Sequence, residues 1–291
     1  MSEMKSSSHD GALPRIGQRR VALVTGGASG IGRGLVEELL DRGLSVAAGD
    51  VNDGHLSALR DDLACHRPRL MTLHLDVAEP SDWSRAVAQI EARFGAIDIL
   101  CLNAGIGILG PILGSRPADW TWLIQVNLAG ATNGLASLLP GMRARGGGHI
   151  LATSSMGGLV AANDGGIYSC AKFGVVALIE ALRAELSDEG IVATVLCPAA
   201  VNTNILDHEA LRPEHLSDSG IVPPPAEAER MREMARSILS LGADPREVGR
   251  RAVAAMDRGD PYVFTDGAVA NLLALREAAI LAGRSRGEGA K

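Results

Sequence analysis

Short apolar runs alternate with amphipathic stretches along most of this chain, and this alternation constrains its fold more than any other feature. Apolar runs of this length are typical of buried strands, and apolar residues at helical spacing indicate helices. We expect strands at 21–25, 45–49, 70–75, 97–102, 149–153, 191–196 and 261–265. We expect helices at 31–42, 53–64, 81–94, 117–139, 167–187, 226–241, 245–258 and 268–281. The pattern predicts an α/β fold with a doubly wound parallel sheet, Rossmann-like, covered by helices on both faces.

The chain has enough apolar residues to bury one large core. It has 291 residues, of which 46% are hydrophobic and 21% charged, so global disorder is excluded. We expect one domain at 20–283, between flexible tails at 1–19 and 284–291. Within it the strand-helix rhythm breaks at about 204–243, where proline and polar residues gather. An excursion of this length predicts a helical lid over the substrate.

Charge and composition exclude several classes of function. The net charge is −6 and there is no basic run, so no nucleic-acid partner is expected. No apolar run reaches transmembrane length and residues 1–20 lack an apolar signal segment, so we expect a cytoplasmic protein without a membrane partner. The arginine-, alanine- and glycine-rich composition suggests a bacterial source. The histidines show no metal-ligand spacing, and the four cysteines are expected to be reduced and buried, so no metal is predicted.

A glycine-rich loop joins the first predicted strand to the first predicted helix. It reads Thr-Gly-Gly-Ala-Ser-Gly-Ile-Gly at 25–32. Gly26, Gly30 and Gly32 permit a tight turn, a close backbone approach to a pyrophosphate and close packing of helix on sheet. The helix N-terminus supplies amide donors and a dipole that favour an anion. A strand before the loop and a helix after it predict a dinucleotide site.

Asp50 follows the second predicted strand, 18 residues after Gly32. A carboxylate at this point accepts hydrogen bonds from the ribose hydroxyls of adenosine and repels a 2′-phosphate. Neither Val51 nor Asn52 offers a positive charge for that phosphate, and Ser29 in the loop is uncharged. The sequence therefore favours NAD over NADP. The alternative is that Asp50 only caps the end of the strand.

Tyr168 and Lys172 lie four residues apart in a segment predicted to be helical, so they share one helix face. A nearby ammonium favours phenolate, so Lys172 is expected to lower the pKa of Tyr168 from its ordinary value of about 10. Tyr168 is then a candidate proton-transfer group. The alternative is an accidental pair on an exposed helix, and the glycine-rich loop upstream favours the chemical interpretation.

With these motifs in order, the chain from about 20 to 265 resembles the short-chain dehydrogenase/reductase family. The loop at 25–32 is similar to the family's TGxxxGIG, and Leu-Asn-Ala-Gly at 102–105 to its NNAG, with leucine at the first position. Asn127 is similar to the asparagine that holds a water in the family's proton relay. Ser155, 13 residues before Tyr168, has the spacing of the catalytic serine, with Ser154 as the neighbouring alternative.

The resemblance implies a set of cofactor contacts. They are Gly26, Ser29, Gly30, Ile31, Gly32, Asp50, Asp76, Val77, Asn103, Ala104, Gly105, Tyr168, Lys172, Val201 and Thr203. Two segments depart from the family. Pro-Ala-Ala-Val-Asn-Thr at 198–203 has Ala199 where PGxVxT has glycine, which puts the local backbone in doubt, and 261–266 differs from the common VDGG ending.

The resemblance also implies a reaction, the NAD-dependent interconversion of a secondary alcohol and its ketone. Tyr168 moves the hydroxyl proton, Ser155 donates to the substrate oxygen, Lys172 supports Tyr168 and holds the nicotinamide ribose, and Asn127 anchors a water that connects Lys172 to solvent. An apolar pocket is expected around Ser155, Met156, Tyr168, Ala199 and Leu206, joined by Ile106 and Ala200. It suits a neutral, hydrophobic small-molecule substrate.

Other functions stay open on the same fold. A non-catalytic NAD-binding regulator has no chemical need for all four residues of the Asn-Ser-Tyr-Lys set. An isomerase or lyase that uses bound NAD transiently would produce no net NADH, and a structural or interaction protein has no surface signal here. The resemblance further implies a homotetramer, or a homodimer, formed through the helices at 117–139 and 167–187.

Overall fold

The computed structural model describes residue 16 and residues 21–113, 115–161, 165–217 and 225–288. Its centre is a seven-stranded sheet in the order β3-β2-β1-β4-β5-β6-β7, in which every neighbouring pair is parallel. The strands are β1 Val21–Thr25, β2 Ser45–Asp50, β3 Leu70–His74, β4 Ile99–Leu102, β5 Gly148–Thr153, β6 Ile191–Cys197 and β7 Tyr262–Phe264. All seven predicted strands are confirmed, with ends that differ by one or two residues.

The described helices follow the predicted order. They are α1 Gly30–Asp41, α2 Asp53–Asp62, α3 Pro80–Phe94, α4 Pro117–Ile124, α5 Gly130–Ala144, α6 Gly166–Glu185, α7 Pro225–Ser240, α8 Pro245–Arg258 and α9 Ala268–Glu288. The long helix predicted at 117–139 is divided, because a π-helical turn, Gln125–Ala129, separates α4 from α5. Such turns are frequent at functional sites, and this one carries Asn127.

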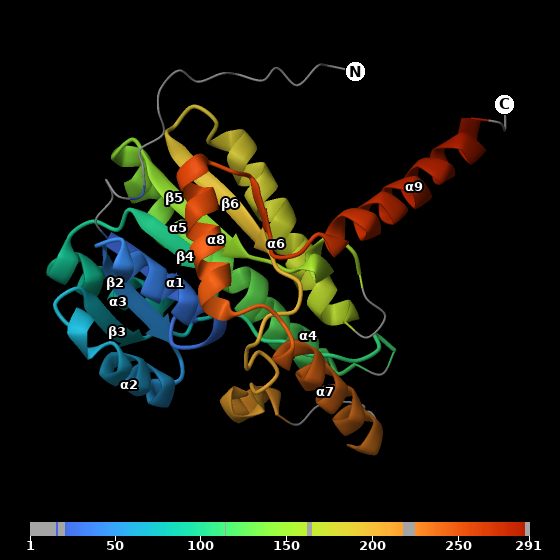
Figure 1. The fold of residues 1–291 in the computed structure, drawn as a ribbon, viewed down its shortest axis with the longest axis horizontal. Helices are drawn as coiled ribbons and strands as arrows, with labels where there is room; N and C mark the ends of the chain where they lie inside the picture. Colours follow the sequence, from blue (N-terminus) through green and yellow to red (C-terminus); the bar gives the residue numbers. More distant parts are fainter. Residues whose placement is uncertain (1–15, 17–20, 114, 162–164, 218–224, 289–291) are drawn as a thin grey trace.

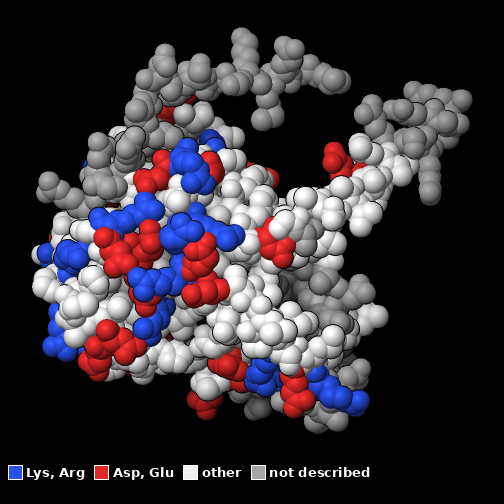
Figure 2. All heavy atoms as spheres, in the orientation of Figure 1, with Lys and Arg blue, Asp and Glu red and all other residues white. Residues whose placement is uncertain are grey.

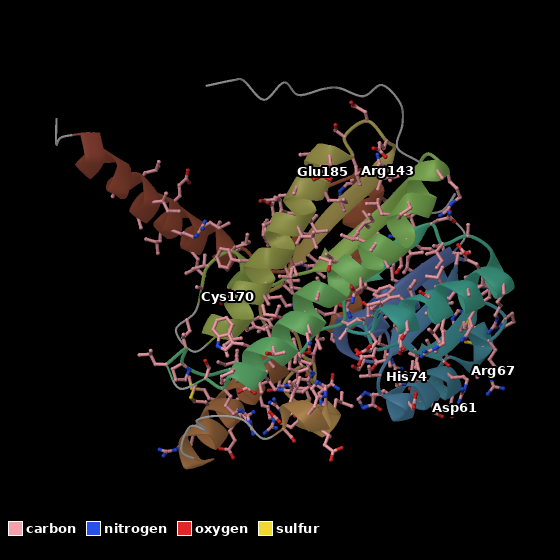
Figure 3. All side chains as sticks on the ribbon, turned by 180° about the vertical axis from the view of Figure 1, so that it is seen from behind. Asp61, Arg67, His74, Arg143, Cys170 and Glu185 are labelled. Carbon is pink, nitrogen blue, oxygen red and sulfur yellow. The ribbon has the colours of Figure 1, made fainter. Side chains whose placement is uncertain are left out.

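Helices cover both faces of the sheet, so the predicted doubly wound fold is confirmed (Figure 1). One core cluster joins the sheet to α1, α2 and α8 through residues such as Leu39, Leu59 and Val253. The other joins it to α3, α5 and α6 through residues such as Trp83 and Ile179. Figure 3 shows α5 and α6 side by side over that second face. Connections of this kind bring the loops after β1, β2, β4 and β5 to one edge of the sheet.

Charges of both signs cover the outer surface of α1 and α8 (Figure 2). Arg42 pairs with Asp257 at 2.5 Å, and Arg246 pairs with Asp41 at 2.8 Å. Positive and negative groups alternate on this face and form no extended region of one sign. Exposed pairs of this kind contribute little to stability, so the packing of α1 on the sheet depends on its buried leucines.

The bounds predicted for α8, 245–258, are confirmed. The Arg246 amide donates to the Asp244 carboxylate at 3.0 Å, and Gly259 ends the helix in the left-handed conformation. Glu247 pairs with Arg250 and Arg251 one turn further on. Glu247 therefore forms ion pairs along the surface of the helix.

The segments outside the sheet differ in places from the predictions. Ile16 lies within the predicted N-terminal tail, yet it is fully buried and its amide donates to Asp257. Helix α9 continues to Glu288, beyond the predicted start of the C-terminal tail. Residues 218–224 of the predicted lid lie outside the described residues, and the rest of it forms two short 3₁₀ turns and α7.

Two further observations concern cysteines and membranes. All four cysteines are free, and Cys101 and Cys197 are buried as predicted. Cys65 and Cys170 are exposed, so the prediction was wrong for these two; Cys170 lies on the outer side of α6 (Figure 3). Across the described ranges, no helix combines the length and apolar character needed to cross a membrane.

Candidate active site

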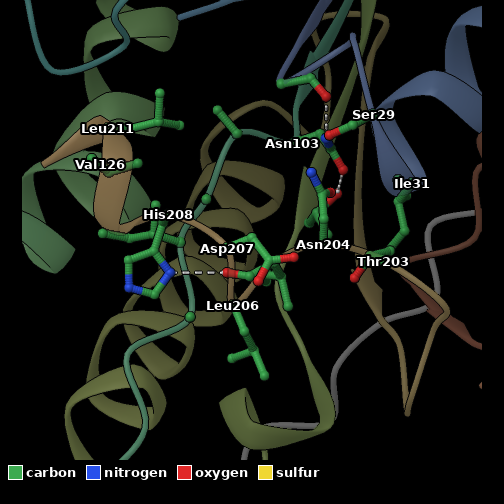
Figure 4. Close-up of a pocket in the computed structure, with 18 of the residues that line it drawn as sticks. Ser29, Ile31, Asn103, Val126, Thr203, Asn204, Leu206, Asp207, His208 and Leu211 are labelled. Carbon is green, nitrogen blue, oxygen red and sulfur yellow. Dashed lines mark hydrogen bonds between the residues drawn. The ribbon is translucent and has the colours of Figure 1, made fainter. Parts of the chain in front are cut away.

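A cavity of about 750 Å³ opens along the carboxyl ends of the strands (Figure 4). Most of the residues predicted for the site line it: Gly26, Ser29, Gly30, Ile31, Asp50, Asp76, Val77, Asn103, Ala104, Gly105, Ser155, Met156, Tyr168, Lys172, Ala199, Val201, Thr203 and Leu206. They come from the segments after six strands, from the start of α1 and, for Tyr168 and Lys172, from α6. Gly32 and Asn127 are not part of the lining. The fold therefore gathers the predicted cofactor and substrate residues around one space.

The glycine-rich loop needs glycine because it approaches other backbone closely. Gly26 and Gly30 have φ angles of +60° and +50°, in the left-handed region that favours glycine. A Cβ on Gly32 would lie 2.0 Å from the Gly26 carbonyl oxygen. Gly32 therefore closes the turn on itself, whereas Gly26 and Gly30 face the cavity.

The N-terminus of α1 fits a bound anion. Its N-cap, Ser29, makes no side-chain capping bond, and the first turn of the helix carries no acidic residue. Ser29, Gly30 and Ile31 line the cavity at this point. Free amides at a helix N-terminus, together with the helix dipole, attract phosphate groups. These residues fit the pyrophosphate of a dinucleotide.

Asp50 stands at the end of β2 on the cavity wall. Its two carboxylate oxygens accept hydrogen bonds from the amides of Ala28, at 3.2 Å, and Asn52, at 3.0 Å. These bonds fix the carboxylate against the loop and leave it further acceptor capacity. Arg33, which follows the loop, pairs instead with Glu37 and Asp62. Among the described lining residues, Lys172 is the only lysine or arginine.

A chain of hydrogen bonds connects the cofactor loop to Lys172. The Thr25 hydroxyl accepts from the amides of Asn103 and Ala104 at 2.9 and 3.0 Å. The Asn103 side chain donates to the Thr25 carbonyl and accepts from the Thr153 hydroxyl at 3.0 Å. The Thr153 carbonyl in turn accepts from Lys172 Nζ at 2.9 Å. The ends of β1, β4 and β5 are thus held in one arrangement.

Asn127 is buried and makes two hydrogen bonds with one neighbour. Its Oδ1 accepts from the Ile106 amide at 2.8 Å, and its Nδ2 donates to the Ile106 carbonyl at 2.9 Å. A Cβ on Gly105 would lie 3.2 Å from Asn127 Oδ1 and 3.3 Å from Lys172 Nζ. The side chain therefore fixes the loop beside Lys172. Oδ1 and Nδ2 each keep one further position for a hydrogen bond, so the water contact that the resemblance implied stays a prediction.

Ser155 and Tyr168 meet on the cavity wall. The Ser155 hydroxyl accepts from the Gly157 amide at 3.0 Å and also interacts with the Tyr168 hydroxyl. Ser154, the neighbouring alternative, is buried and donates to the Lys172 carbonyl at 2.8 Å. The geometry thus directs Ser155 to the reaction space, while Ser154 fixes α6 against β5.

The expected effect of Lys172 on Tyr168 is wrong for the protein alone. Burial raises the pKa of Tyr168 to about 12, and the hydrogen bond with Ser155 only partly offsets it. Burial also lowers the pKa of Lys172 to about 8. Lys172 Nζ lies 5.6 Å from the centre of the Tyr168 ring and bonds to Thr153. Desolvation outweighs the charge here, so Tyr168 is a phenol at neutral pH.

The segment after β6 accommodates Ala199 in place of glycine. No described non-glycine residue has a positive φ, so the backbone at Ala199 does not need glycine. The Ala199 amide donates to the Thr265 hydroxyl at 2.9 Å. Thr203 lies against Gly30, since a Cβ on that glycine would be 2.9 Å from Thr203 Cγ2. The segment that departs from the family pattern therefore still closes over the cofactor loop.

The sequence reasoning missed several residues of the substrate side. Trp122, Gln125, Asn204, His208, Leu211 and Leu239 all line the cavity. Figure 4 shows His208, Leu211 and Val126 on the opposite side of the space from Ser29 and Asn103. No local pattern marks these residues, because they come from α4, the segment after β6 and α7. Among the described residues, no group of three His, Cys, Asp or Glu side chains is arranged to hold a metal.

Comparison with known proteins identifies the family. The family model for short chain dehydrogenases matches residues 20–213, about two thirds of the chain. The chain belongs to the short-chain dehydrogenase/reductase family. It is therefore an oxidoreductase of this family. The motifs at 25–32 and 168–172 both lie within the matched residues.

Three relatives illustrate the similarity. The C alpha-dehydrogenase of Sphingobium sp. is 33% identical over 85% of this chain and 80% of its own. The 3beta-hydroxysteroid dehydrogenase 2 of Eggerthella lenta is 36% identical over 64% of this chain and 72% of its own. A short-chain dehydrogenase/reductase of Burkholderia phymatum, solved in complex with NAD, has a TM-score of 0.86 at 28% identity. That match covers 91% of this chain and 95% of the other.

Lys172 gives the protein a pH signature. Burial lowers its pKa from 10.5 to about 8, so between these values the unfolded chain holds the proton and the folded protein does not. Stability from this group therefore rises as pH rises through that window. We expect the unfolding free energy of Lys172→Met, relative to wild type, to fall by roughly 2–3 kcal/mol between pH 7 and pH 10. Urea unfolding of both proteins at the two pH values measures this change. A difference in unfolding free energy that stays the same from pH 7 to pH 10 would contradict the lowered pKa of Lys172.

Proposed function

We propose that this protein is an NAD-dependent oxidoreductase that interconverts a neutral, bulky and largely apolar secondary alcohol and its ketone. The observation that carries the proposal is the meeting of Ser155, Tyr168 and Lys172 on the wall of one cavity. The same cavity contains the free N-terminus of α1 and the Asp50 carboxylate. A dinucleotide site and a proton-transfer group thus share one space, as hydride transfer requires.

Each side chain has a separate task. A bound nicotinamide supplies the hydride acceptor or donor. Ser155 donates a hydrogen bond to the substrate oxygen, and Tyr168 exchanges the proton with that same oxygen. Lys172, held by the Thr153 carbonyl, lies beside the Tyr168 ring, where its charged form offsets negative charge that forms on the phenol oxygen. Since burial keeps Tyr168 protonated, the protein alone is set to donate a proton to a ketone, and alcohol oxidation is favoured by higher pH.

The lining of the cavity supports an apolar substrate. Ile106, Met156, Leu206 and Leu211 contribute apolar surface, and no described arginine faces the space to hold a carboxylate or phosphate. The cavity of about 750 Å³, which the cofactor and the substrate would share, is within the range of ligand pockets. The name of one relative, a 3beta-hydroxysteroid dehydrogenase, is consistent with a bulky alcohol.

The function is tested by absorbance of reduced cofactor with a panel of neutral secondary alcohols, and with the matching ketones in the reverse direction. We expect turnover with NAD, faster alcohol oxidation at pH 9 than at pH 7, and loss of at least about 100-fold in kcat for Tyr168→Phe. NADH binding to that variant, followed by fluorescence, is expected to persist. Normal turnover by Tyr168→Phe would refute the mechanism, and NAD binding without any turnover would favour a regulator.

The preference for NAD depends on the charge of Asp50. Asp50→Asn keeps an acceptor for the Ala28 amide and removes the negative charge that repels a 2′-phosphate. We expect the ratio of kcat/KM for NAD over NADP to fall about tenfold or more in this variant. A wild-type protein that prefers NADP would show that the Asp50 carboxylate does not select the adenosine ribose without a 2′-phosphate.

We also propose that the chain assembles into a homotetramer, or a homodimer, through α4, α5 and α6. Helix α9 projects from the body in Figure 1 and exposes Leu275, Ile280 and Leu281. Exposed apolar residues on one helix favour contact with a second copy. Light scattering is expected to give two or four times the chain mass of 30.2 kDa, and a monomer mass would contradict the proposal.

A further inference from the structure

Two aromatic side chains from distant parts of the chain meet on the substrate side of the cavity. Trp122 belongs to α4, and His208 lies in the segment after β6. Their ring centres are 5.3 Å apart with an interplanar angle of 63°, which is an edge-to-face arrangement. Both side chains are largely buried, and both line the cavity. We call this pair the aromatic wall.

The aromatic wall is connected to the reaction centre by packing. Trp122 belongs to a compact apolar cluster with Ile106, Ile167 and Ala171, and Tyr168 packs against the same cluster. Val126 also packs there and lines the cavity. A shift of Trp122 therefore changes the shape of the space next to Tyr168. The wall lies where the part of the substrate beyond its carbinol carbon must go.

Arg212 supports the wall from behind and does not itself line the cavity. Its guanidinium carbon lies 4.5 Å from the centre of the Trp122 ring, a cation–π contact. Its side chain is only 6% exposed. It pairs with Asp119 at 2.8 Å and with Glu209 at 2.9 Å. Asp119 lies on α4 with Trp122, and Glu209 is next to His208 in the sequence. One guanidinium therefore contacts both segments that carry the rings.

Asp119 is held in turn by a second arginine. Arg116 Nε and Nη2 donate to its two carboxylate oxygens at 2.8 and 2.7 Å. On balance these contacts lower the pKa of Asp119, against the opposing effect of burial, so it stays ionised. Burial likewise lowers the pKa of His208, and its Nδ1 interacts with the Ile205 carbonyl at 3.2 Å. The wall therefore presents a neutral ring edge, with its charges behind it.

A buried ion pair often adds no stability over an apolar side chain of similar volume, so stability alone does not explain the position of Arg212. Arg212 Nη1 is buried and has no hydrogen-bond partner among the described residues. The arginine is thus not placed for maximal bonding. Its guanidinium lies over the Trp122 ring, and a planar guanidinium can stack on an aromatic ring in a way that a lysine ammonium cannot.

We propose that Trp122 and His208 form the specificity-determining wall for a substrate with a flat or alicyclic ring beside its secondary carbinol, and that Arg212 is the positioning residue that holds both. The inference rests on the proposed function for the identity of the carbinol. The ring preference itself is a property of binding and can be measured without turnover.

The first experiment measures binding alone. Acetophenone and acetone are titrated calorimetrically into the protein in the presence of NAD, a combination that cannot react. We expect Arg212→Met to weaken acetophenone binding about tenfold, with a much smaller change for acetone. Arg212→Lys, which keeps the charge without the planar group, is expected to recover only part of the loss. Arg251→Met, an exposed arginine on α8 paired with Glu247, is the matched control and is expected to match wild type.

The second experiment measures turnover, with 1-phenylethanol and propan-2-ol as substrates. We expect Arg212→Met to raise KM for 1-phenylethanol about tenfold with kcat within about threefold, and to reduce the preference for the ring substrate. Equal loss with both alcohols, or equal binding of acetophenone by wild type and Arg212→Met, would overturn the inference. Trp122→Phe, which keeps a ring at the wall, provides the same comparison if Arg212→Met does not fold.

The two experiments separate the inference from the proposed function. Acetophenone binding that depends on Arg212, without turnover of any alcohol, would support the aromatic wall and reject the oxidoreductase mechanism. Turnover in wild type with no preference for ring alcohols would support the oxidoreductase mechanism and reject the aromatic wall. A wild-type protein that binds neither acetophenone nor any other ring ketone would overturn the aromatic wall.

Discussion

The hydrogen-bond chain from Thr25 through Asn103 and Thr153 to Lys172 is the interaction on which the rest of the site depends. It joins the ends of three neighbouring strands at the edge where the cavity opens. Parallel strands alone would bring these loops to the same edge but would not fix their distances. The chain connects the loop that receives the cofactor to the ammonium beside Tyr168. A disturbance at either end therefore changes the relation between the two halves of the site.

The same arrangement explains why both proton-carrying groups are perturbed. Lys172 is 2% exposed, and this burial disfavours its charged form although Nζ donates a hydrogen bond to the Thr153 carbonyl. Tyr168 faces the cavity from a largely apolar cluster that disfavours phenolate. Strongly shifted groups that meet in a cleft are typical of a catalytic site. Mutual attraction would lower the pKa of Tyr168 and raise that of Lys172. Both pKa values shift in the opposite direction, so desolvation governs the pair.

Sequence reasoning was sufficient where the chemistry follows local spacing. The left-handed glycines at 26 and 30, Asp50 after β2, and the four-residue step from Tyr168 to Lys172 are all properties of short segments. The strand-helix alternation predicted the sheet for the same reason. It failed where the outcome depends on burial: the spacing of Tyr168 and Lys172 predicted a lowered tyrosine pKa, and desolvation reversed it.

The substrate side was not predictable from the sequence in the same way. Trp122 is separated from His208 and Arg212 by the whole of α5, β5, α6 and β6, and nothing local marks these residues as partners. Their relation appears only when the segment after β6 packs against α4. Asn127 lies between these cases, because its motif was visible but its two bonds to Ile106 depend on the π-helical turn.

The central claim is direct hydride transfer between a carbinol carbon and a nicotinamide at this cavity. The most direct measurement uses 1-phenylethanol with deuterium at its carbinol carbon, followed by mass spectrometry of the reduced cofactor. The account predicts one deuterium in each NADH formed by the wild-type protein. NADH that carries no deuterium, or deuterium transfer that continues undiminished in Tyr168→Phe, would contradict it.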